Sequence, residues 1–224
     1  MIRLHFVVEG QTEETFVRDI LAPELAGRSV VADVHRITTG RKKGTLYRGG
    51  FVAYAHIRRD LSLWMKQERR SEVRFTTMID LYRLPHDFPG MKACEKIADP
   101  LGKVECLESM FRGDLNDHRL IPYIQLYEFE ALLFSDPDAF SSAFPIADAE
   151  IEELKRIRGS FPSPEHINDY PNKAPSKRIC ELLPGYVKTA YGLAVAKTIG
   201  LSRMRAECKH FNHWIEALFG LSEI

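Results

Sequence analysis

The sequence has few cysteines and no long apolar run. Only four cysteines occur among 224 residues and none forms a CxxC pair, a number and scatter that exclude a disulfide framework. We therefore expect a reducing, cytoplasmic environment. No apolar stretch reaches the roughly 18 residues that a membrane-spanning helix needs. The apolar start of the chain, residues 1–8, is too short for a signal peptide and is typical of a strand.

The chain also lacks net charge. Its 31 basic and 31 acidic side chains cancel, which excludes a protein that coats nucleic acid through net charge alone. The charges alternate along the chain, with 13 basic against 8 acidic residues in 1–70, 3 against 10 in 128–170, and 8 against 2 in 171–213. This pattern fits a cation-attracting centre between phosphate-binding flanks, although a solvated surface explains such runs more often.

Strand and helix patterns alternate in the first part of the chain. Apolar or β-branched runs predict strands over 2–8, 29–38, 73–79 and 120–127. Helical spacing of apolar residues predicts helices over 12–25, 51–70 and between 91 and 112, with a glycine-rich basic loop over 38–50. Strands separated by helices predict an α/β fold with a mostly parallel four-stranded sheet flanked by helices. We expect an α/β core over 1–134 and a mainly helical C-terminal elaboration over 135–224, packed as one compact unit.

Acidic residues follow three of the four predicted strands. Glu9 follows the first, Asp80 the third and Glu128 the fourth, with Glu13 and Glu130 close behind. Since the carboxyl ends of parallel strands share one edge of a sheet, we expect these acids to converge there. Carboxylates gathered in this way favour Mg²⁺ or Mn²⁺. Each acid also has an ordinary explanation, as a helix-start residue or a loop cap.

A second cluster of possible metal ligands lies near the end of the sequence. Cys208, His210 and His213 are close together in a helical pattern. Three ligands without a fourth partner are a weak zinc signal. We favour a buried thiol with packed or exposed imidazoles.

Several segments together resemble the uncharacterised family DUF4276. They are VVEGQTEETFV (7–17), MIDLYRLPHDFPG (78–90), IPYIQLYEFEALLFSD (121–136), PNKAPSKRI (171–179) and CKHFNHW (208–214). That family is similar to a divergent branch of the TOPRIM fold, related to the nuclease domains of OLD proteins and found beside ATPases in bacterial defence settings. The resemblance implies a TOPRIM-like α/β core.

The resemblance also implies roles for particular acids. Glu9 with Gly10 matches the Glu-Gly after the first TOPRIM strand, and Glu13 resembles an additional acid of OLD-like nucleases. Asp80 matches the first aspartate of the TOPRIM DxD motif, whereas Tyr82 replaces the second. Full two-metal binding would then need an oxygen from elsewhere. Glu128 and Glu130 are the candidates for that ligand.

The function that these features predict is a Mg²⁺-dependent nuclease, acting on DNA or RNA as a possible anti-phage defence effector. Glu9, Asp80 and Glu128 would be catalytic, and Glu9, Glu13, Asp80, Glu128 and Glu130 would bind Mg²⁺ or Mn²⁺. Basic side chains would bind the phosphates of the nucleic acid. The candidates are Arg41, Lys42, Lys43, Lys173, Lys177 and Arg178.

Two other functions remain open. The chain could be a non-catalytic effector or regulatory subunit of an ATPase-containing defence complex, which the incomplete DxD motif and the neutral net charge favour. It could also be a phosphotransferase or phosphatase for a small substrate, since parallel sheets carry many such sites. The sequence leaves the number of metals, the oligomeric state and the activating trigger open.

Overall fold

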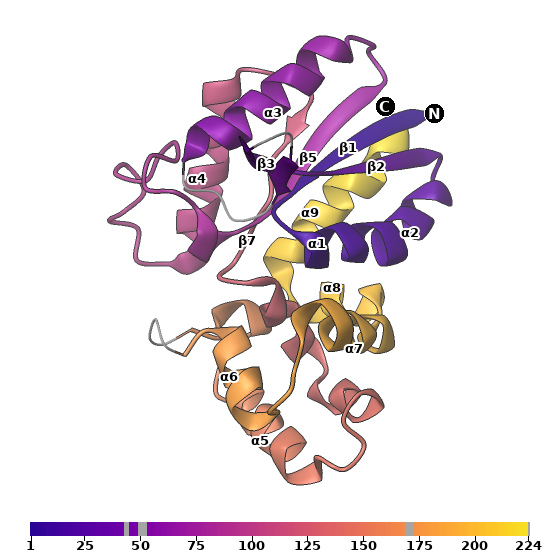
Figure 1. Ribbon diagram of the computed structural model, residues 1–224, viewed down its shortest axis with the longest axis vertical. Coiled ribbons are helices and arrows are strands. Elements are labelled where there is room, and N and C mark those ends of the chain that lie inside the picture. Colours follow the sequence, from indigo (N-terminus) through magenta and orange to yellow (C-terminus); the bar gives the residue numbers. More distant parts are fainter. Residues whose placement is uncertain (43–44, 49–52, 169–172, 224) are drawn as a thin grey trace. The chain divides into compact units, whose positions relative to one another are not determined.

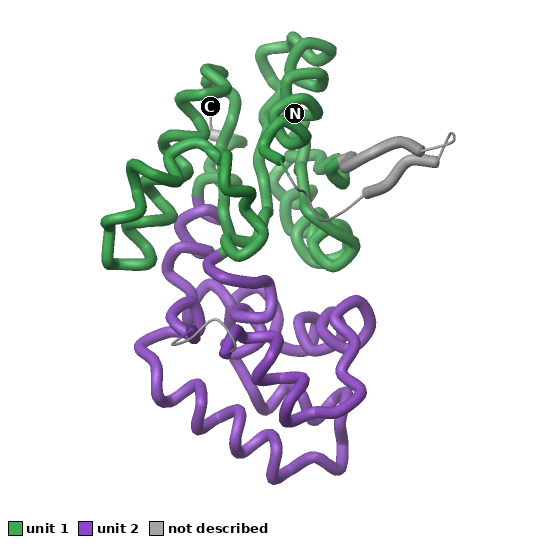
Figure 2. The backbone as a smooth tube through the Cα atoms, turned by 60° about the vertical axis from the view of Figure 1, so that its left-hand side comes forward, with its two compact units in different colours: residues 1–125, 217–224 green, residues 126–216 purple. Residues whose placement is uncertain are grey.

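The structure, a computed structural model, describes residues 1–42, 45–48, 53–168 and 173–223, with the backbone alone described for 38–42, 45–48 and 223. The chain divides into two compact units (Figure 2). Unit 1 comprises Met1–Gln125 and Ala217–Ile224, and unit 2 comprises Leu126–Glu216. The units are defined by compactness alone, so the domain boundary expected between residues 134 and 135 stays a prediction.

Unit 1 is built on a parallel sheet (Figure 1). Its strands lie in the order β2, β1, β5 and β6, and a further short strand, β7, also pairs with β5. Every pairing within this sheet is parallel. The bounds are β1 Ile2–Val8, β2 Val30–Arg36, β5 Val73–Asp80, β6 Leu120–Ile121 and β7 Ile124–Gln125. The predicted α/β class with a mostly parallel sheet flanked by helices is confirmed.

The strand predicted over 120–127 is interrupted, and this is a correction. It forms two short pieces, β6 and β7, on either side of Pro122 and Tyr123. Proline has no N–H to donate to a strand ladder, so the regular pairing with β5 cannot continue through Pro122. The sheet therefore has five strands.

The predicted loop over 38–50 is also corrected. Strand β3 (Thr38–Lys42) pairs antiparallel with β4 (Thr45–Arg48) as a separate two-stranded sheet. The glycines and lysines of this segment favour a loop, but its threonines, leucine and tyrosine have strand propensity. The antiparallel pairing satisfies the backbone groups that a loop would leave to water.

Helical segments precede and follow the strands of unit 1. The helix expected over 12–25 runs from Gln11 to Ala26 as α1 (Gln11–Phe16), a π-helical turn (Val17–Leu21) and α2 (Ala22–Ala26). Helix α3 covers Tyr54–Gln67. A short 3₁₀ turn, η2 (Leu81–Arg83), follows β5 directly, and another, η7 (Gly220–Glu223), lies near the end of the chain.

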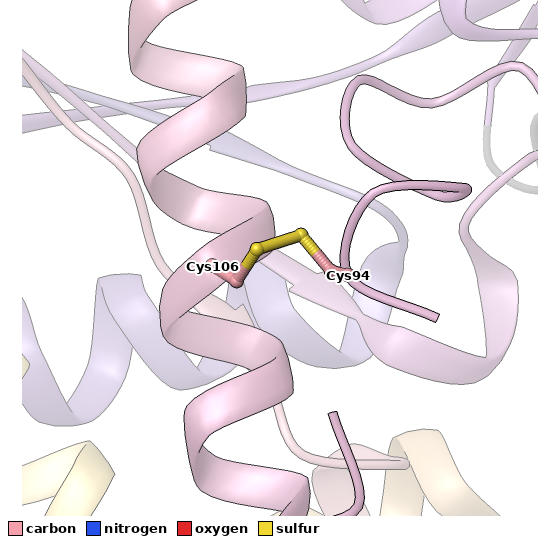
Figure 3. Close-up of a disulfide and its surroundings, with 2 residues drawn as sticks. All are labelled: Cys94 and Cys106. Carbon is pink, nitrogen blue, oxygen red and sulfur yellow. A yellow bond between two sulfur atoms is a disulfide. The ribbon is translucent and has the colours of Figure 1, made fainter. Parts of the chain in front are cut away.

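Helix α4 begins later than the sequence predicted. It spans Pro100–Leu115, because Asp99 caps its first turn by accepting a hydrogen bond from the Gly102 N–H (2.9 Å) and Pro100 suits its first position. The segment before α4 is tied to it by a disulfide between Cys94 and Cys106 (Figure 3). The scatter of the four cysteines excluded a framework of several disulfides, but it did not reveal this single pair.

Unit 2 is mainly helical, as expected for the C-terminal half. Its longest helices that lie wholly inside the unit are α5 (Asp148–Gly159) and α6 (Pro175–Leu182), and α9 (Lys209–Phe219) continues into unit 1. Shorter segments complete it, namely η3 (Phe129–Ser135), η4 (Pro137–Ser142), η5 (Pro164–His166), η6 (Lys188–Gly192), α7 (Leu193–Ile199) and α8 (Leu201–Glu207). None of the helices in the described part of the chain has the length and apolar character to cross a membrane.

Candidate functional site

Glu9 and Asp80 lie at the carboxyl ends of neighbouring strands. Strands β1 and β5 are parallel, with Val8 opposite Met78, and the Glu9 N–H donates to the Met78 carbonyl oxygen (3.3 Å). Adjacent strands are about 4.8 Å apart, so the two acids start from adjoining backbone positions at one edge of the sheet. Both residues are buried, with exposed fractions of 8% for Glu9 and 7% for Asp80.

Gln125 extends this edge onto a third strand. It lies opposite Asp80 in the β5–β7 pairing. The side chain of Gln125 is fully buried, and its Oε1 accepts a hydrogen bond from the Tyr123 hydroxyl (2.7 Å). That bond satisfies a polar group inside an apolar strand. It also holds the Gln125 side chain in one position beside Asp80.

The carboxylate of Glu13 turns back toward the end of β1. Its Oε2 accepts a hydrogen bond from the Gly10 N–H (2.9 Å), so Glu13 caps the first turn of α1. A Cβ placed on Gly10 would come within 3.1 Å of the same oxygen, a spacing that only glycine accommodates without displacement. Gly10 thus allows a buried acid to approach the backbone directly after Glu9.

Arg83 reaches the same edge from the turn after β5. Its Nε lies 3.6 Å from the Glu9 Oε1, and its side chain is 64% exposed whereas that of Glu9 is 11% exposed. Tyr82, at the position of the second DxD aspartate, is 40% exposed. The edge therefore carries the carboxylates of Glu9, Glu13 and Asp80 and one guanidinium.

The carboxylates of Glu9 and Asp80 are the type of ligand that a hard cation such as Mg²⁺ prefers. Mg²⁺ keeps several waters and needs one or two carboxylates from the protein, and Glu9 and Asp80 supply two from adjacent strand ends. Across the described ranges, no three His, Cys, Asp or Glu side chains are placed to hold a metal together. That Glu9 and Asp80 hold a cation together stays a prediction.

Glu128 and Glu130 belong to unit 2, and their surroundings are described within that unit. The Glu128 Oε2 accepts a hydrogen bond from the Ser176 N–H at the start of α6 (3.0 Å). Lys188 Nζ donates to the Glu130 Oε2 (2.8 Å) and lies 3.9 Å from the Glu128 Oε1. Glu130 is fully buried, and burial raises the pKa of its carboxyl group while Lys188 opposes that shift.

The predicted metal ligands are therefore distributed over both units. Glu9, Glu13 and Asp80 lie in unit 1, and Glu128 and Glu130 lie in unit 2. Within unit 2, Lys188 provides the positive charge that the two glutamates face. That all five acids hold one metal centre stays a prediction.

The predicted phosphate-binding residues of unit 2 lie on and before α6. Lys177 is exposed, Lys173 Nζ lies 3.5 Å from the Glu181 Oε2, and the Arg178 Nε donates to the Lys173 carbonyl oxygen (2.8 Å). The Arg178 guanidinium also lies over the Phe161 ring, 5.4 Å from its centroid. Arg41 and Lys42 lie on β3, where only the backbone is described, and Lys43 lies outside the described residues.

The cluster around Cys208 has a structural explanation. The Cys208 thiol is buried 3.4 Å from the Ser135 hydroxyl, and burial raises its pKa. The N–H groups of His210 and Phe211 donate to the buried Glu165 carboxylate (3.1 and 2.9 Å), which caps the start of α9. His213 is exposed. The preferred interpretation, a buried thiol with packed or exposed imidazoles, is confirmed.

The sequence analysis did not single out Arg83 or Lys188. Arg83 lies within the segment 78–90 that carries the family resemblance but was given no role there, and Lys188 lies outside the quoted segments. Each approaches a predicted acid through the fold. For Arg83 there was a usable signal, since it lies three residues after Asp80 in a loop that follows a strand end. No comparable signal marks Lys188, which is 58 residues from Glu130 along the chain.

The sheet and its edge of acids define an α/β protein with a candidate cation site at the strand ends. The chain belongs to the DUF4276 family, described as a domain of unknown function, whose model matches residues 8–219. This confirms the resemblance that the motifs predicted. None of the curated proteins compared with the chain matches it.

Two solved structures are similar to the chain, and both are of the C-terminal region of the Xanthomonas campestris pv. campestris OLD protein. The structure phased with iodine has 11% identity and a TM-score of 0.46, covering 100% of this chain and 97% of that one. The structure phased with mercury has 13% identity and a TM-score of 0.38, covering 97% of each chain. Likenesses of this size carry no argument about activity.

Proposed function

We propose that this protein is a metal-dependent nuclease that hydrolyses phosphodiester bonds of DNA or RNA, as a bacterial defence effector. The observation that carries the proposal is the placement of two buried carboxylates, Glu9 and Asp80, at the ends of adjacent parallel strands. The match of Glu9-Gly10 and Asp80 to TOPRIM motifs supports phosphodiester chemistry. The edge also includes Glu13, fixed against the backbone by Gly10.

In this proposal Glu9 and Asp80 hold one Mg²⁺ or Mn²⁺ ion. A bound divalent ion lowers the pKa of a coordinated water and stabilises the negative charge that develops on phosphate oxygens. Glu9 and Asp80 follow two neighbouring strands of the sheet and would hold such an ion from backbone that is fixed by strand pairing. Glu128 is the proposed third catalytic acid. Lys173, Lys177 and Arg178, together with Arg41, Lys42 and Lys43, are proposed to bind the phosphates of the substrate.

The test is cleavage of supercoiled plasmid DNA and of single-stranded RNA with Mg²⁺ or Mn²⁺. We expect Glu9→Gln and Asp80→Asn to lower the cleavage rate at least about 100-fold, the lower range for loss of an acid–base or metal-binding group. Glu24→Gln is the matched control, because Glu24 is a surface acid of α2 that contacts Arg28 (3.7 Å). Equal cleavage by all four proteins, or none by the wild type, would refute the nuclease.

A non-catalytic role is the second candidate. Tyr82 replaces the second acid of the DxD motif, and within the described residues no three ligands gather around one point. These observations favour a regulatory subunit bound to a partner ATPase. Stable co-purification with an ATPase encoded nearby, without metal-dependent cleavage by either the chain alone or the complex, would support this role over the nuclease.

A further inference from the structure

Arg83 places a positive charge beside one of the two proposed metal ligands. It ends the 3₁₀ turn η2, which starts directly after Asp80, and its Nε lies 3.6 Å from the Glu9 Oε1. A short turn thus carries the chain from Asp80 on β5 to a contact with the acid that follows β1. Arg83 therefore reaches Glu9 from the connection that begins at Asp80.

This charge lies at the edge where the TOPRIM pattern would provide another acid. Tyr82 brings no carboxylate, so the segment from Asp80 to Arg83 contributes one negative and one positive charge. A second divalent cation next to Glu9 would lose the attraction of the missing acid and meet the repulsion of the guanidinium. The arrangement favours one divalent ion over two.

The guanidinium is also available to a substrate. Its side chain is 64% exposed, and a 3.6 Å separation is longer than a hydrogen bond, so the contact with Glu9 is a charge interaction at the edge of the site. Arginine binds phosphate through two parallel N–H donors, a geometry that a point charge does not provide. Arg83 can therefore face Glu9 and a phosphate together.

We propose that Arg83 is a catalytic residue that takes the place of a second metal ion. Glu9 and Asp80 hold a single divalent cation, and Arg83 binds a non-bridging oxygen of the phosphate that is cleaved. This inference rests on the proposed nuclease function. The alternative is an ordinary surface ion pair between Arg83 and Glu9, which would contribute little to either binding or catalysis.

The first experiment measures cation binding without substrate. Mn²⁺ is titrated into the wild type, Arg83→Gln and Arg83→Lys, and bound Mn²⁺ is followed by calorimetry and by electron paramagnetic resonance. We expect one Mn²⁺ per chain, and an affinity about 3- to 10-fold higher in Arg83→Gln because a repulsive charge is removed. Arg83→Lys keeps the charge and should keep the wild-type affinity. Two Mn²⁺ per wild-type chain, or unchanged affinity in Arg83→Gln, would overturn the proposal.

The second experiment measures the substrate side of the same residue. Arg83→Gln should cleave plasmid DNA or RNA about 100-fold or more slowly, the scale of losing a charged group that stabilises a transition state. Arg83→Lys should recover only part of the rate, since lysine lacks the paired donors. We expect Arg83→Gln to cleave more slowly and to bind Mn²⁺ more tightly. A variant that had lost its structure would cleave more slowly but would not bind Mn²⁺ more tightly. Wild-type cleavage by Arg83→Gln contradicts the assignment.

The matched control is Arg58→Gln. Arg58 forms a comparable surface pair in the same unit, with its Nε 3.0 Å from the Asp114 Oδ2 and a side chain 55% exposed. Its removal should change neither Mn²⁺ binding nor cleavage. Circular dichroism of each variant verifies that the fold is retained.

A third measurement separates failure of this inference from failure of the nuclease proposal. A labelled 20-nucleotide DNA strand and its RNA equivalent are bound to each variant in Mn²⁺, and the affinity is measured against salt concentration. Arg83→Gln should weaken binding and reduce the salt slope by about one phosphate contact. If the wild type cleaves nothing, the nuclease fails, and unchanged oligonucleotide binding by Arg83→Gln would then refute the role of Arg83 as well.

Discussion

The side chain of Thr77 and the backbone of Tyr123 form a reciprocal pair of hydrogen bonds. The Tyr123 N–H donates to the Thr77 Oγ1, and that hydroxyl donates to the Tyr123 carbonyl oxygen, both at 2.9 Å. Both residues are fully buried. The pair lies where Pro122 interrupts the strand ladder, so a threonine side chain replaces the backbone pairing between β5 and the β6–β7 segment.

We predict that Thr77→Val destabilises the protein by about 2 to 3 kcal/mol, because it removes two hydrogen bonds and leaves a buried N–H without a partner. Urea unfolding followed by circular dichroism measures this free energy. Thr76→Val is the comparison on the same strand, since the Thr76 hydroxyl donates to the Ile121 carbonyl oxygen (2.6 Å). If both variants lowered the free energy of unfolding by the same amount, the reciprocal pair of hydrogen bonds would contribute no extra stability.

Reduction of the Cys94–Cys106 disulfide should loosen the segment that follows the candidate site. The two cysteines are separated by 12 positions, and closing a loop of that length contributes about 3 kcal/mol. We expect Cys94→Ser, or treatment with a reducing agent, to lower stability by up to that amount and to speed proteolysis between residues 84 and 99. Cys180→Ser, at an exposed free thiol, should do neither. Alkylation of all four thiols in the unreduced, unfolded protein would contradict the disulfide.

The paired imidazoles of His5 and His35 predict a pH-dependent stability. The His5 Nδ1 lies 3.1 Å from the His35 Nε2, so one nitrogen must be unprotonated. Burial, followed by the charge of His35, lowers the pKa of His5 below its usual 6.5; Arg3 adds to the shift, and Asp33 and Glu68 oppose it. Because the pKa of His5 is lower in the folded state, the folded protein binds fewer protons than the unfolded chain below pH 6.5. The free energy of unfolding therefore has its full value above pH 6.5 and decreases as the pH falls below 6.5.

The measurement is urea unfolding at pH 7.5 and pH 5.5. The wild type should lose about 1 kcal/mol over this range, less than the limit of one proton per molecule. His5→Phe should flatten the pH dependence, because a ring that does not titrate then occupies the stack with Phe75. His118→Gln, at an exposed position, should retain it. If His5→Phe lost as much stability between pH 7.5 and pH 5.5 as the wild type, groups other than His5 would cause the pH dependence.

Lys188 should be required for the stability of unit 2. Its ammonium group is hydrogen bonded to the buried Glu130 carboxylate, and Lys188→Met would leave that group without its partner. We expect a loss of about 2 kcal/mol, the size of a charged hydrogen bond, together with a further rise in the pKa of Glu130. The double variant Lys188→Met with Glu130→Gln should recover part of this loss. If the loss of stability in the double variant equalled the sum of the losses in the two single variants, Lys188 and Glu130 would not be energetically coupled.

Local sequence patterns were sufficient to predict the strands that form the sheet core. β1 and β5 are apolar runs with clear limits, and both are buried over most of their length, as expected for inner strands of a parallel sheet. β2 was predicted from its β-branched residues, and as an edge strand it is only partly buried. The break at Pro122 was foreseeable from the missing N–H. What kept the segment on β5, the hydroxyl of Thr77, depends on a contact across 46 positions that no local pattern contains.

The candidate site was predictable to a similar degree. Strand ends gave Glu9 and Asp80 their expected places, since parallel topology brings such positions to one edge. The contacts of Arg83 with Glu9 and of Lys188 with Glu130 depend on side-chain reach from distant segments. Such pairs follow from the three-dimensional packing, and the spacing of residues along the chain does not show them.

The α/β unit is formed from two separate stretches of chain, with all of unit 2 between them. Within unit 1 the returning stretch is bound, for example, by the Arg28 guanidinium, which lies 3.8 Å from the centroid of the Phe219 ring. During translation a ribosome adds Phe219 only after every residue of unit 2 has been made. A nascent chain that stops short of this point holds the acids of β1 and β5 in an incomplete unit, so unit 1 is completed only after unit 2 has been synthesised.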